Sequence, residues 1–240
     1  MFAQLVSIVV PAFNPAPGWS QLLLQQWKDL QDAIPDQQLE LILVNDGSST
    51  PSFAAEADTL IREIPSLRLL QHSSNRGKGA ALRTGVGATN TSLILVTDVD
   101  FPYTTISMVA TLAAVAGNGA DIAAGSRNEQ YYNKVPWLRS VLSRFLRWLI
   151  RKRLQLPFDD TQCGLKAMNT KGRALFLQTK TERYLYDLEF IVKAASIRSL
   201  NIQPVPVQLR QGIVLRRMSP RILLQEAGNF LNILLHRNRL

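Results

Sequence analysis

The chain of 240 residues is long enough to bury one large hydrophobic core, and its single cysteine, Cys163, excludes an intramolecular disulfide. No apolar run approaches the roughly 20 residues that a membrane-spanning helix needs, and the first residues lack the basic leader of a signal peptide. Of the formal net charge of +9, residues 134–153 contribute seven basic and no acidic side chains, and residues 208–240 contribute six basic and one acidic. We therefore expect a cytoplasmic protein, soluble or peripheral to a membrane, whose positive surface charge is concentrated in these two segments.

Short apolar runs alternate with segments of helical periodicity over the first half of the chain. The runs are typical of strands that are buried on both faces. This alternation predicts an α/β fold with a doubly wound, mainly parallel sheet and right-handed crossovers. The expected strands lie at residues 5–11, 39–44, 67–71, 93–97 and 121–125, and the expected helices at residues 19–34, 53–64 and 104–116, with one more opened by the loop at residues 75–79.

Polar residues and glycines gather where each expected strand ends. Because the carboxyl ends of parallel strands share one rim of the sheet, we expect these clusters to converge on a single site. The clusters are Phe13-Asn14, Asn45–Ser49, Asn75–Gly79, Asp98 with Asp100, and Ser126-Arg127.

Asp98 and Asp100 follow the fourth apolar run directly. Two carboxylates one residue apart repel each other, and their hard oxygen atoms suit Mg²⁺ or Mn²⁺ holding a diphosphate. The pair therefore predicts a divalent metal site, although a solvated turn after a strand is the alternative for such a motif alone.

The segment Gly77-Lys78-Gly79 belongs to neither of two common phosphate-binding motifs. A dinucleotide fingerprint needs G-x-G-x-x-G after the first strand, and a P-loop needs four residues between its first glycine and Gly-Lys. Neither spacing is present here. The start of a helix at this point nevertheless favours a nearby anion, and Lys78 is long enough to reach one. A solvated lysine is the alternative.

Residues 135–156 combine Trp, Phe and Leu at helical spacing with several Arg and Lys and no acid. This composition is typical of a helix that lies in the plane of a membrane interface. A core-packing helix with a basic outer face is the alternative. Residues 222–235 are also amphipathic and predict either a second membrane contact or an interaction helix.

Six motifs occur in order along the chain, namely IVVPAFN (8–14), LVNDGSS (43–49), NRGKGAALRTG (75–85), TDVD (97–100), GSR (125–127) and DTQCGLKAMN (160–169). Together they make the chain resemble family 2 glycosyltransferases with a GT-A fold, and within them the dolichyl- or polyprenyl-phosphate glucosyl- and mannosyltransferases. The resemblance covers about residues 5–217. It implies a GT-A domain over residues 1–217, which includes the amphipathic helix, followed by a C-terminal amphipathic helix over residues 218–240.

The resemblance also implies roles in binding a nucleoside diphosphate sugar. Asp46 would read the nucleobase, and Asp98 and Asp100 would contact the ribose and the metal ion that bridges the diphosphate. The residues implied in donor binding are Pro11, Phe13, Asn14, Asp46, Lys78, Asp98, Val99, Asp100 and Arg216.

A further set is implied in catalysis and acceptor binding. Arg127 and Arg139 would meet phosphate groups, as a guanidinium fork does well. Asp160 and Gln162 would position the acceptor, together with Arg139. Asp187 is a candidate general base, with a helix cap as the structural alternative. Cys163 is expected to be a packed residue.

The resemblance implies a metal-dependent, inverting transfer of a hexose from a UDP-glucose or GDP-mannose type donor to polyprenyl or dolichyl phosphate. A phosphate acceptor has its second pKa near about 6, so a base is optional. The expected partners are the donor, the lipid phosphate and the anionic cytoplasmic face of a membrane, and no nucleic acid. A family 2 enzyme that acts on a saccharide or lipid hydroxyl and a non-catalytic nucleotide-sugar or membrane-binding module remain the alternatives.

Overall fold

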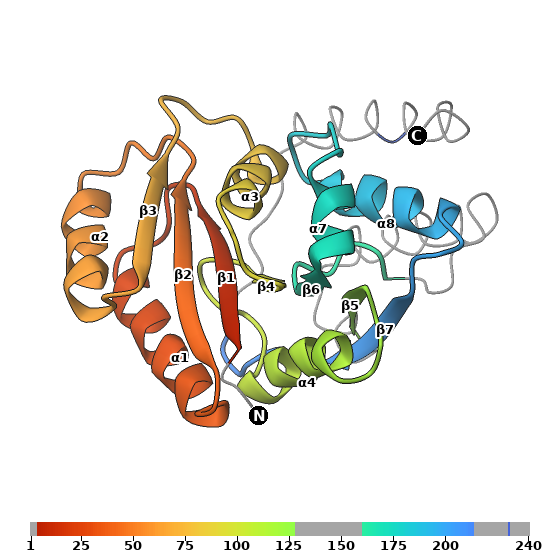
Figure 1. The fold of residues 1–240 in the computed structure, drawn as a ribbon. Helices are drawn as coiled ribbons and strands as arrows, with labels where there is room; N and C mark the ends of the chain where they lie inside the picture. The colour runs from red at the N-terminus through yellow and green to blue at the C-terminus, as the bar shows by residue number, and fades with distance from the viewer. Residues whose placement is uncertain (1–3, 128–159, 214–229, 231–240) are drawn as a thin grey trace.

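The computed structural model describes residues 4–127, 160–213 and 230, and within them one sheet is packed between two layers of helices (Figure 1). The amphipathic segment 135–156 and nearly all of the segment 218–240 lie outside the described residues, as do Arg139 and Arg216. The strands are β1 (Leu5–Ala12), β2 (Gln38–Asn45), β3 (Leu67–Gln71), β4 (Leu93–Val96), β5 (Ile122–Arg127), β6 (Lys166–Asn169) and β7 (Ile202–Val207). The helices are α1 (Trp19–Ala33), α2 (Ser52–Glu63), α3 (Lys78–Gly87), α4 (Thr105–Ala116), α7 (Thr170–Phe176) and α8 (Tyr186–Ser196).

The described strands form one seven-stranded sheet in the order β3-β2-β1-β4-β6-β5-β7. Strand β6 runs antiparallel to both of its neighbours, and every other pairing is parallel. The carboxyl ends of the six remaining strands therefore point the same way. Their loops meet at one rim, which is where open α/β sheets bind ligands.

Both faces of the sheet are buried. Successive side chains of β1 alternate between two hydrophobic clusters, with Val6, Ile8 and Val10 on one face and Val9 on the other. The first cluster also holds residues of α1, α2 and α4, and the second holds residues of α3, α7 and α8. Figure 1 shows these two sets of helices on opposite sides of the sheet. Burial on both faces explains why the strands read as continuous apolar runs.

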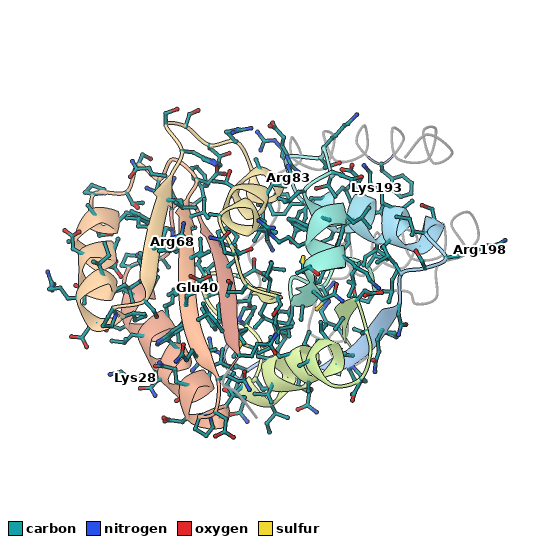
Figure 2. All side chains as sticks on the ribbon, in the orientation of Figure 1. Lys28, Glu40, Arg68, Arg83, Lys193 and Arg198 are labelled. Atoms are coloured by element: carbon teal, nitrogen blue, oxygen red, sulfur yellow. The ribbon has the colours of Figure 1, made fainter. Side chains whose placement is uncertain are left out.

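Exposed charged side chains such as Lys28 and Arg198 lie on the outside of the molecule (Figure 2). Arg83 of α3 instead binds the segment between α7 and α8, on the same face of the sheet. Its guanidinium donates to the carbonyl of Thr181 at 2.6 Å and to the hydroxyl of Thr179 at 3.3 Å. This contact holds the segment before α8 against α3.

The expected elements of the first half agree with the structure within about two residues at each end. The structure confirms the doubly wound, mainly parallel sheet and adds the antiparallel β6, which the sequence did not predict. It also adds α7 and β7. Helix α8 begins at Tyr186, next to the residue for which a helix cap was the alternative.

Gly85 of α3 faces the sheet, where a Cβ would overlap Cγ1 of Val9. We expect Gly85→Ala to lower the free energy of unfolding by about 1 kcal/mol, because overpacking outweighs the gain in helix propensity. The matched control is Gly87→Ala in the same helix, whose Cβ would lie 3.7 Å from Leu177. This control should raise that free energy by about 0.5 kcal/mol. Denaturant unfolding measures both, and an equal increase would contradict the close packing of α3 on β1.

Candidate functional site

Contacts between loops join the strand ends into one continuous rim. The first contact ties the loop after β1 to the loop after β2. The side-chain oxygen of Asn14 accepts from the backbone of Ser49 at 2.9 Å and of Thr50 at 3.3 Å. The backbone N–H of Asn14 donates to the hydroxyl of Ser48 at 3.0 Å. Asn14 has a positive φ of 42°, a conformation that asparagine tolerates better than most residues.

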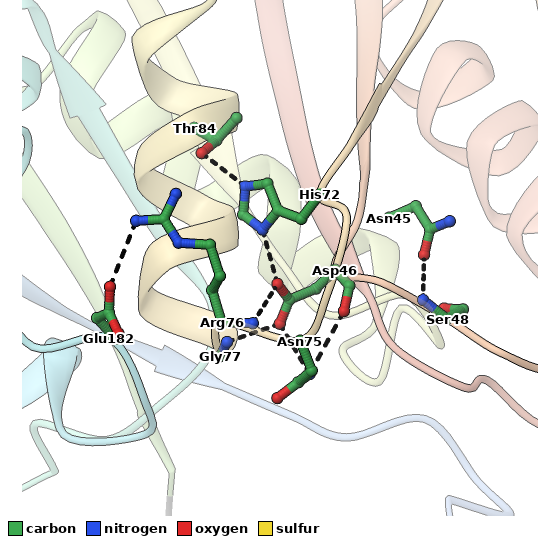
Figure 3. A network of polar contacts seen from close by, with 9 residues as sticks. All are labelled: Asn45, Asp46, Ser48, His72, Asn75, Arg76, Gly77, Thr84 and Glu182. Carbon is green, nitrogen blue, oxygen red and sulfur yellow. Dashed lines mark hydrogen bonds and ion pairs between the residues drawn. The ribbon is translucent and has the colours of Figure 1, made fainter.

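Asp46 joins the loop after β2 to the loop after β3 (Figure 3). Its carboxylate is 2% exposed and accepts from four donors. One oxygen accepts from Nδ1 of His72 at 2.7 Å and the backbone N–H of Arg76 at 2.9 Å. The other accepts from the side chain of Asn75 at 2.9 Å and the backbone N–H of Gly77 at 2.7 Å. In this structure the acceptor positions of Asp46 are occupied by donors of the chain itself, and the role in reading a nucleobase that the resemblance implied stays a prediction.

Two glycines make this close approach of loops possible. Gly47 has a φ of +71°, and a Cβ there would lie 2.5 Å from the carbonyl carbon of Ser74. Gly77 has a φ of +108°, and its Cβ would lie 2.5 Å from the carbonyl oxygen of Glu182. Only glycine adopts such backbone conformations without strain. The sequence Asp46-Gly47 therefore serves the packing of the loops against each other.

Lys78, the first residue of α3, connects the loop after β3 to the loop after β4. Its ammonium group forms an ion pair with Asp98, with 19% of the lysine and 34% of the aspartate side chain exposed. Burial alone would lower the pKa of Lys78, but the charges of Asp98 and Asp187 outweigh burial and raise it. Gly164 packs against this pair, since a Cβ there would lie 2.6 Å from Oδ2 of Asp98 and 3.2 Å from Nζ of Lys78.

Asp100 is exposed at the tip of the same loop. Partial enclosure of its carboxylate, followed by the negative charge of Asp98, raises the pKa of Asp100. The backbone here is held by Arg210, whose guanidinium donates to the carbonyls of Asp100 and Phe101, each at 2.6 Å. Phe101 has a positive φ of 40°, so this turn needs such support. The role of Arg210 was not predicted from the sequence, because this residue is 110 positions from Asp100.

Tyr103 and Cys163 are buried beside this loop. The hydroxyl of Tyr103 accepts from the thiol of Cys163 at 3.2 Å and from the backbone N–H of Gly164 at 3.1 Å. Burial raises the pKa of the Cys163 thiol. A buried, protonated thiol is a poor nucleophile, so the structure agrees with the expectation of a packed residue.

Arg127, at the end of β5, forms a two-pronged ion pair with Asp160. Its Nε and Nη2 each donate to one carboxylate oxygen at 2.7 Å, and its backbone N–H donates at 2.9 Å. Burial would raise the pKa of Asp160, but the hydrogen bonds and charge of Arg127 outweigh burial and lower it. Two residues that were expected to meet phosphate and acceptor therefore form a charge-neutral unit at the rim.

Asp187 lies in the first turn of α8 and does not cap it, because the N-cap position is Leu185, with no side-chain cap hydrogen bond. Its carboxylate instead accepts from the ammonium of Lys166 at 2.5 Å. Lys166 is fully buried and also donates to the carbonyl of Cys163 at 2.6 Å. Burial raises the pKa of Asp187, and the charges of Lys166 and Lys78 counteract this effect. The pairing of Asp187 with Lys166 was not predicted from the sequence.

Four other residues were expected to bind the donor or the acceptor. Pro11 is buried in β1, Phe13 is 45% exposed beside it, and Val99 and Gln162 are partly buried next to Asp98 and Cys163 in the chain. Arg139 and Arg216 lie outside the described residues. The roles of all these residues in binding or catalysis stay predictions.

Within residues 4–127, 160–213 and 230, no three acidic, histidine or cysteine side chains gather into a metal cage. Asp98 and Asp100 nevertheless fit a divalent ion that takes part of its coordination from substrate. Magnesium sites of this kind use one or two carboxylates together with phosphate oxygens and water. The raised pKa of Asp100 beside Asp98 also reflects repulsion that a bound cation would relieve.

The chain is similar to known proteins in both sequence and fold. Residues 7–184 match the model of Glycosyl transferase family 2. A dolichyl-phosphate beta-glucosyltransferase of Trichomonas vaginalis is 30% identical over 215 residues, which cover 84% of this chain and 63% of that protein. The chain thus spans less than two thirds of that relative.

Two solved structures share the fold. Mannosyl-3-phosphoglycerate synthase from Rubrobacter xylanophilus has a TM-score of 0.72 at 16% identity, covering 98% of this chain and 74% of that chain. The mannosyltransferase PcManGT from Pyrobaculum calidifontis, solved with GDP-Man and Mn²⁺, has a TM-score of 0.60 at 15% identity, covering 86% and 56%. The expected GT-A fold is thereby confirmed.

The Arg127–Asp160 pair predicts a pH-dependent contribution to stability. Because the folded-state pKa of Asp160 is lowered, the contribution is complete above the ordinary value of 3.8 and is lost as the pH falls through the lower folded value. We expect Asp160→Asn to cost about 3 kcal/mol at pH 7, since it removes the carboxylate that offsets the charge of the largely buried Arg127 guanidinium, and less at acid pH. Denaturant unfolding across this range measures the difference.

The matched control is Asp58→Asn, which removes one charge from an exposed position of α2. It corrects for the change in net charge. A penalty for Asp160→Asn that stays constant below pH 3.8 would contradict the assignment of the pair.

Proposed function

Because the chain belongs to glycosyl transferase family 2, we propose that it transfers a hexose from a nucleoside diphosphate sugar to polyprenyl or dolichyl phosphate. The observation that carries this proposal is the Asp98–Asp100 loop at the rim, with Lys78 paired to Asp98 beside it. The similarity to a dolichyl-phosphate beta-glucosyltransferase supports the acceptor. A UDP-glucose or GDP-mannose type donor fits the same proposal.

We propose that Asp98 and Asp100 hold Mg²⁺ or Mn²⁺ together with the donor diphosphate. Their carboxylate oxygens are the ligands such ions prefer, and the related fold of PcManGT was solved with Mn²⁺. When bound, the ion supplies positive charge that offsets the charge growing on the leaving diphosphate. Two acidic side chains in one exposed loop suit the binding of a cation, whereas they add little to the stability of the fold.

Lys78 supplies a second positive charge at the same place. In the structure its ammonium neutralises Asp98. In the proposed complex the cation takes over that task, so the lysine becomes available to the diphosphate. Its position at the start of α3 adds the positive end of the helix dipole. The charge of the donor is therefore met by side chain, helix and metal together.

The acceptor phosphate is proposed to attack the anomeric carbon in line, with inversion. Near pH 7 its oxygen is already largely ionised, because the second pKa of a phosphate monoester is about 6. A general base is then unnecessary. Arg127, Asp160 and Gln162 lie on the proposed acceptor side, and Arg139 belongs to the same proposal. Asp187 serves mainly to balance the buried charge of Lys166.

One observation favours a hydroxyl acceptor instead. The raised pKa of Asp187 and its closeness to the charge of Lys78 are features of a general base. A saccharide or lipid hydroxyl must lose its proton during attack, so such an enzyme would depend on this carboxylate. The two acceptors therefore predict different effects of changing Asp187.

In the part of the chain that the structure describes, no helix has both the length and the apolar character to cross a bilayer. We propose that the chain works at the cytoplasmic face of a membrane, where its lipid acceptor would lie. The excess of arginine and lysine in residues 134–153 supports contact with an anionic surface.

Asp100→Asn tests the metal-dependent transfer. We expect turnover to fall about 100-fold or more, because one carboxylate charge is lost from the site that stabilises the leaving group. The assay supplies labelled nucleoside diphosphate sugars, polyprenyl phosphate and Mn²⁺ or Mg²⁺. Asp58→Asn is the matched control and should retain full activity. Undiminished transfer by Asp100→Asn, or by the wild type in excess chelator, would overturn the metal assignment.

Asp187→Asn distinguishes the two acceptors. With a phosphate acceptor we expect turnover to fall less than about tenfold, whereas loss of a general base costs about 10²–10⁴-fold. Because this change leaves Lys166 with one partner fewer, the double variant Lys166→Met, Asp187→Asn removes both charges and serves as the second measurement. Rates are compared per folded protein. A thousandfold loss in both variants would indicate a hydroxyl acceptor.

A further inference from the structure

We propose that His72 is a positioning residue for the donor site, which acts by holding the carboxylate of Asp46 against the loop that begins α3. The nature of the donor rests on the function proposed above, whereas the mechanical role of His72 does not. His72 follows β3 and Asp46 follows β2. Asp46 is one of the expected donor-binding residues, whereas His72 lies outside the site residues that the sequence predicted. Figure 3 shows the imidazole between Asp46 and α3.

The imidazole of His72 is held at both ring nitrogens. Nδ1 lies 2.7 Å from Oδ1 of Asp46, and Nε2 lies 2.9 Å from the hydroxyl of Thr84 in α3. An ionised carboxylate only accepts, so Nδ1 carries the proton in this contact. The Thr84 hydroxyl can either donate or accept, so it satisfies Nε2. The ring is therefore fixed between α3 and the loop after β2.

Asp46 transmits this restraint to the backbone. Its carboxylate receives one donor from His72, one from the side chain of Asn75 and two from the backbone, at Arg76 and Gly77. All four acceptor positions of the carboxylate are then used. If His72 no longer donates, a buried charge keeps one acceptor position unmet, and the carboxylate can turn away from the two backbone groups.

The loop ends at the residue that meets the proposed donor. Gly77 is bonded to Asp46 at 2.7 Å and packs against the backbone of Glu182, so its position is fixed from two sides. Lys78 follows at once and pairs with Asp98. A shift of the Arg76–Gly77 backbone therefore moves the ammonium that is proposed to meet the diphosphate. A displacement of about 1 Å at such a site costs about 10²-fold in rate.

The competing interpretation is that His72 only fills space between α3 and the loop. A merely structural residue would tolerate any replacement of similar size equally well. The positioning role instead depends on one atom, Nδ1, and on the direction of its donor. This difference can be measured with a pair of amide replacements.

Asparagine and glutamine separate the two nitrogens of His72. The amide nitrogen of asparagine occupies about the position of Nδ1, and that of glutamine about the position of Nε2. His72→Asn can therefore still donate to Asp46, whereas His72→Gln can contact Thr84 only. Thr84→Val is the third variant, since it removes the outer support and keeps the donor to Asp46.

The first measurement is hydrogen exchange at the backbone amides of Arg76 and Gly77, which needs no activity. We expect exchange at both amides to quicken about tenfold or more in His72→Gln, because their common acceptor is released, and to stay near the wild-type rate in His72→Asn. Amides of β1 report global stability and should be unchanged. Thr84→Val should lie between the two histidine variants.

The second measurement is steady-state kinetics with donor and acceptor varied separately. We expect His72→Gln to raise the KM for the nucleotide sugar and lower kcat while the KM for polyprenyl phosphate stays constant, and His72→Asn to restore both. If the asparagine and glutamine variants agree in exchange, the positioning role is wrong. If the wild type transfers no sugar and binds neither UDP nor GDP with Mn²⁺, the proposed function fails, and the exchange data still decide the role of His72.

Discussion

The carboxylate of Asp46 is the group on which the arrangement of the rim depends. It is a buried charge with four donors, and two of those donors are backbone N–H groups of the loop that starts α3. Burying such a charge without partners would be costly, so the loops after β2 and β3 must meet in this one geometry. The glycines at positions 47 and 77 allow the two loops to approach closely. This contact fixes the start of α3 and thereby places Lys78 beside Asp98.

Beyond this anchor, the rim consists of opposite charges that neutralise one another. Lys78 pairs with Asp98, Arg127 with Asp160, and Lys166 with Asp187, all close to the carboxyl ends of the strands. Buried pairs contribute little net stability compared with apolar residues of the same size. Their concentration at one edge is better explained by charged substrates. The proposed nucleoside diphosphate, divalent cation and lipid phosphate would together demand charges of both signs.

Local sequence patterns predicted the strands, the first helices and the polar strand ends, because each of these depends on periodicity and on residues close together in the chain. They did not predict β6, because the position of its four residues is determined by pairing with the neighbouring strands β4 and β5. They also missed His72 and Arg210, whose partners lie 26 and 110 positions away. For Asp46 they indicated a place at the rim, but its buried partners come from another loop. Tertiary contacts decide whether a carboxylate faces a ligand or the chain.

The central claim is that a divalent cation and a nucleoside diphosphate bind together at the Asp98–Asp100 loop. Paramagnetic broadening of backbone amide signals by Mn²⁺ in the presence of UDP or GDP tests it most directly, with Mg²⁺ as the diamagnetic reference. The account predicts strong broadening at Val99 and Gly164, far weaker broadening at Leu5 and Leu93 at the amino ends of β1 and β4, and loss of the effect in Asp98→Asn. Broadening that is centred elsewhere, or that persists in Asp98→Asn, would contradict the account.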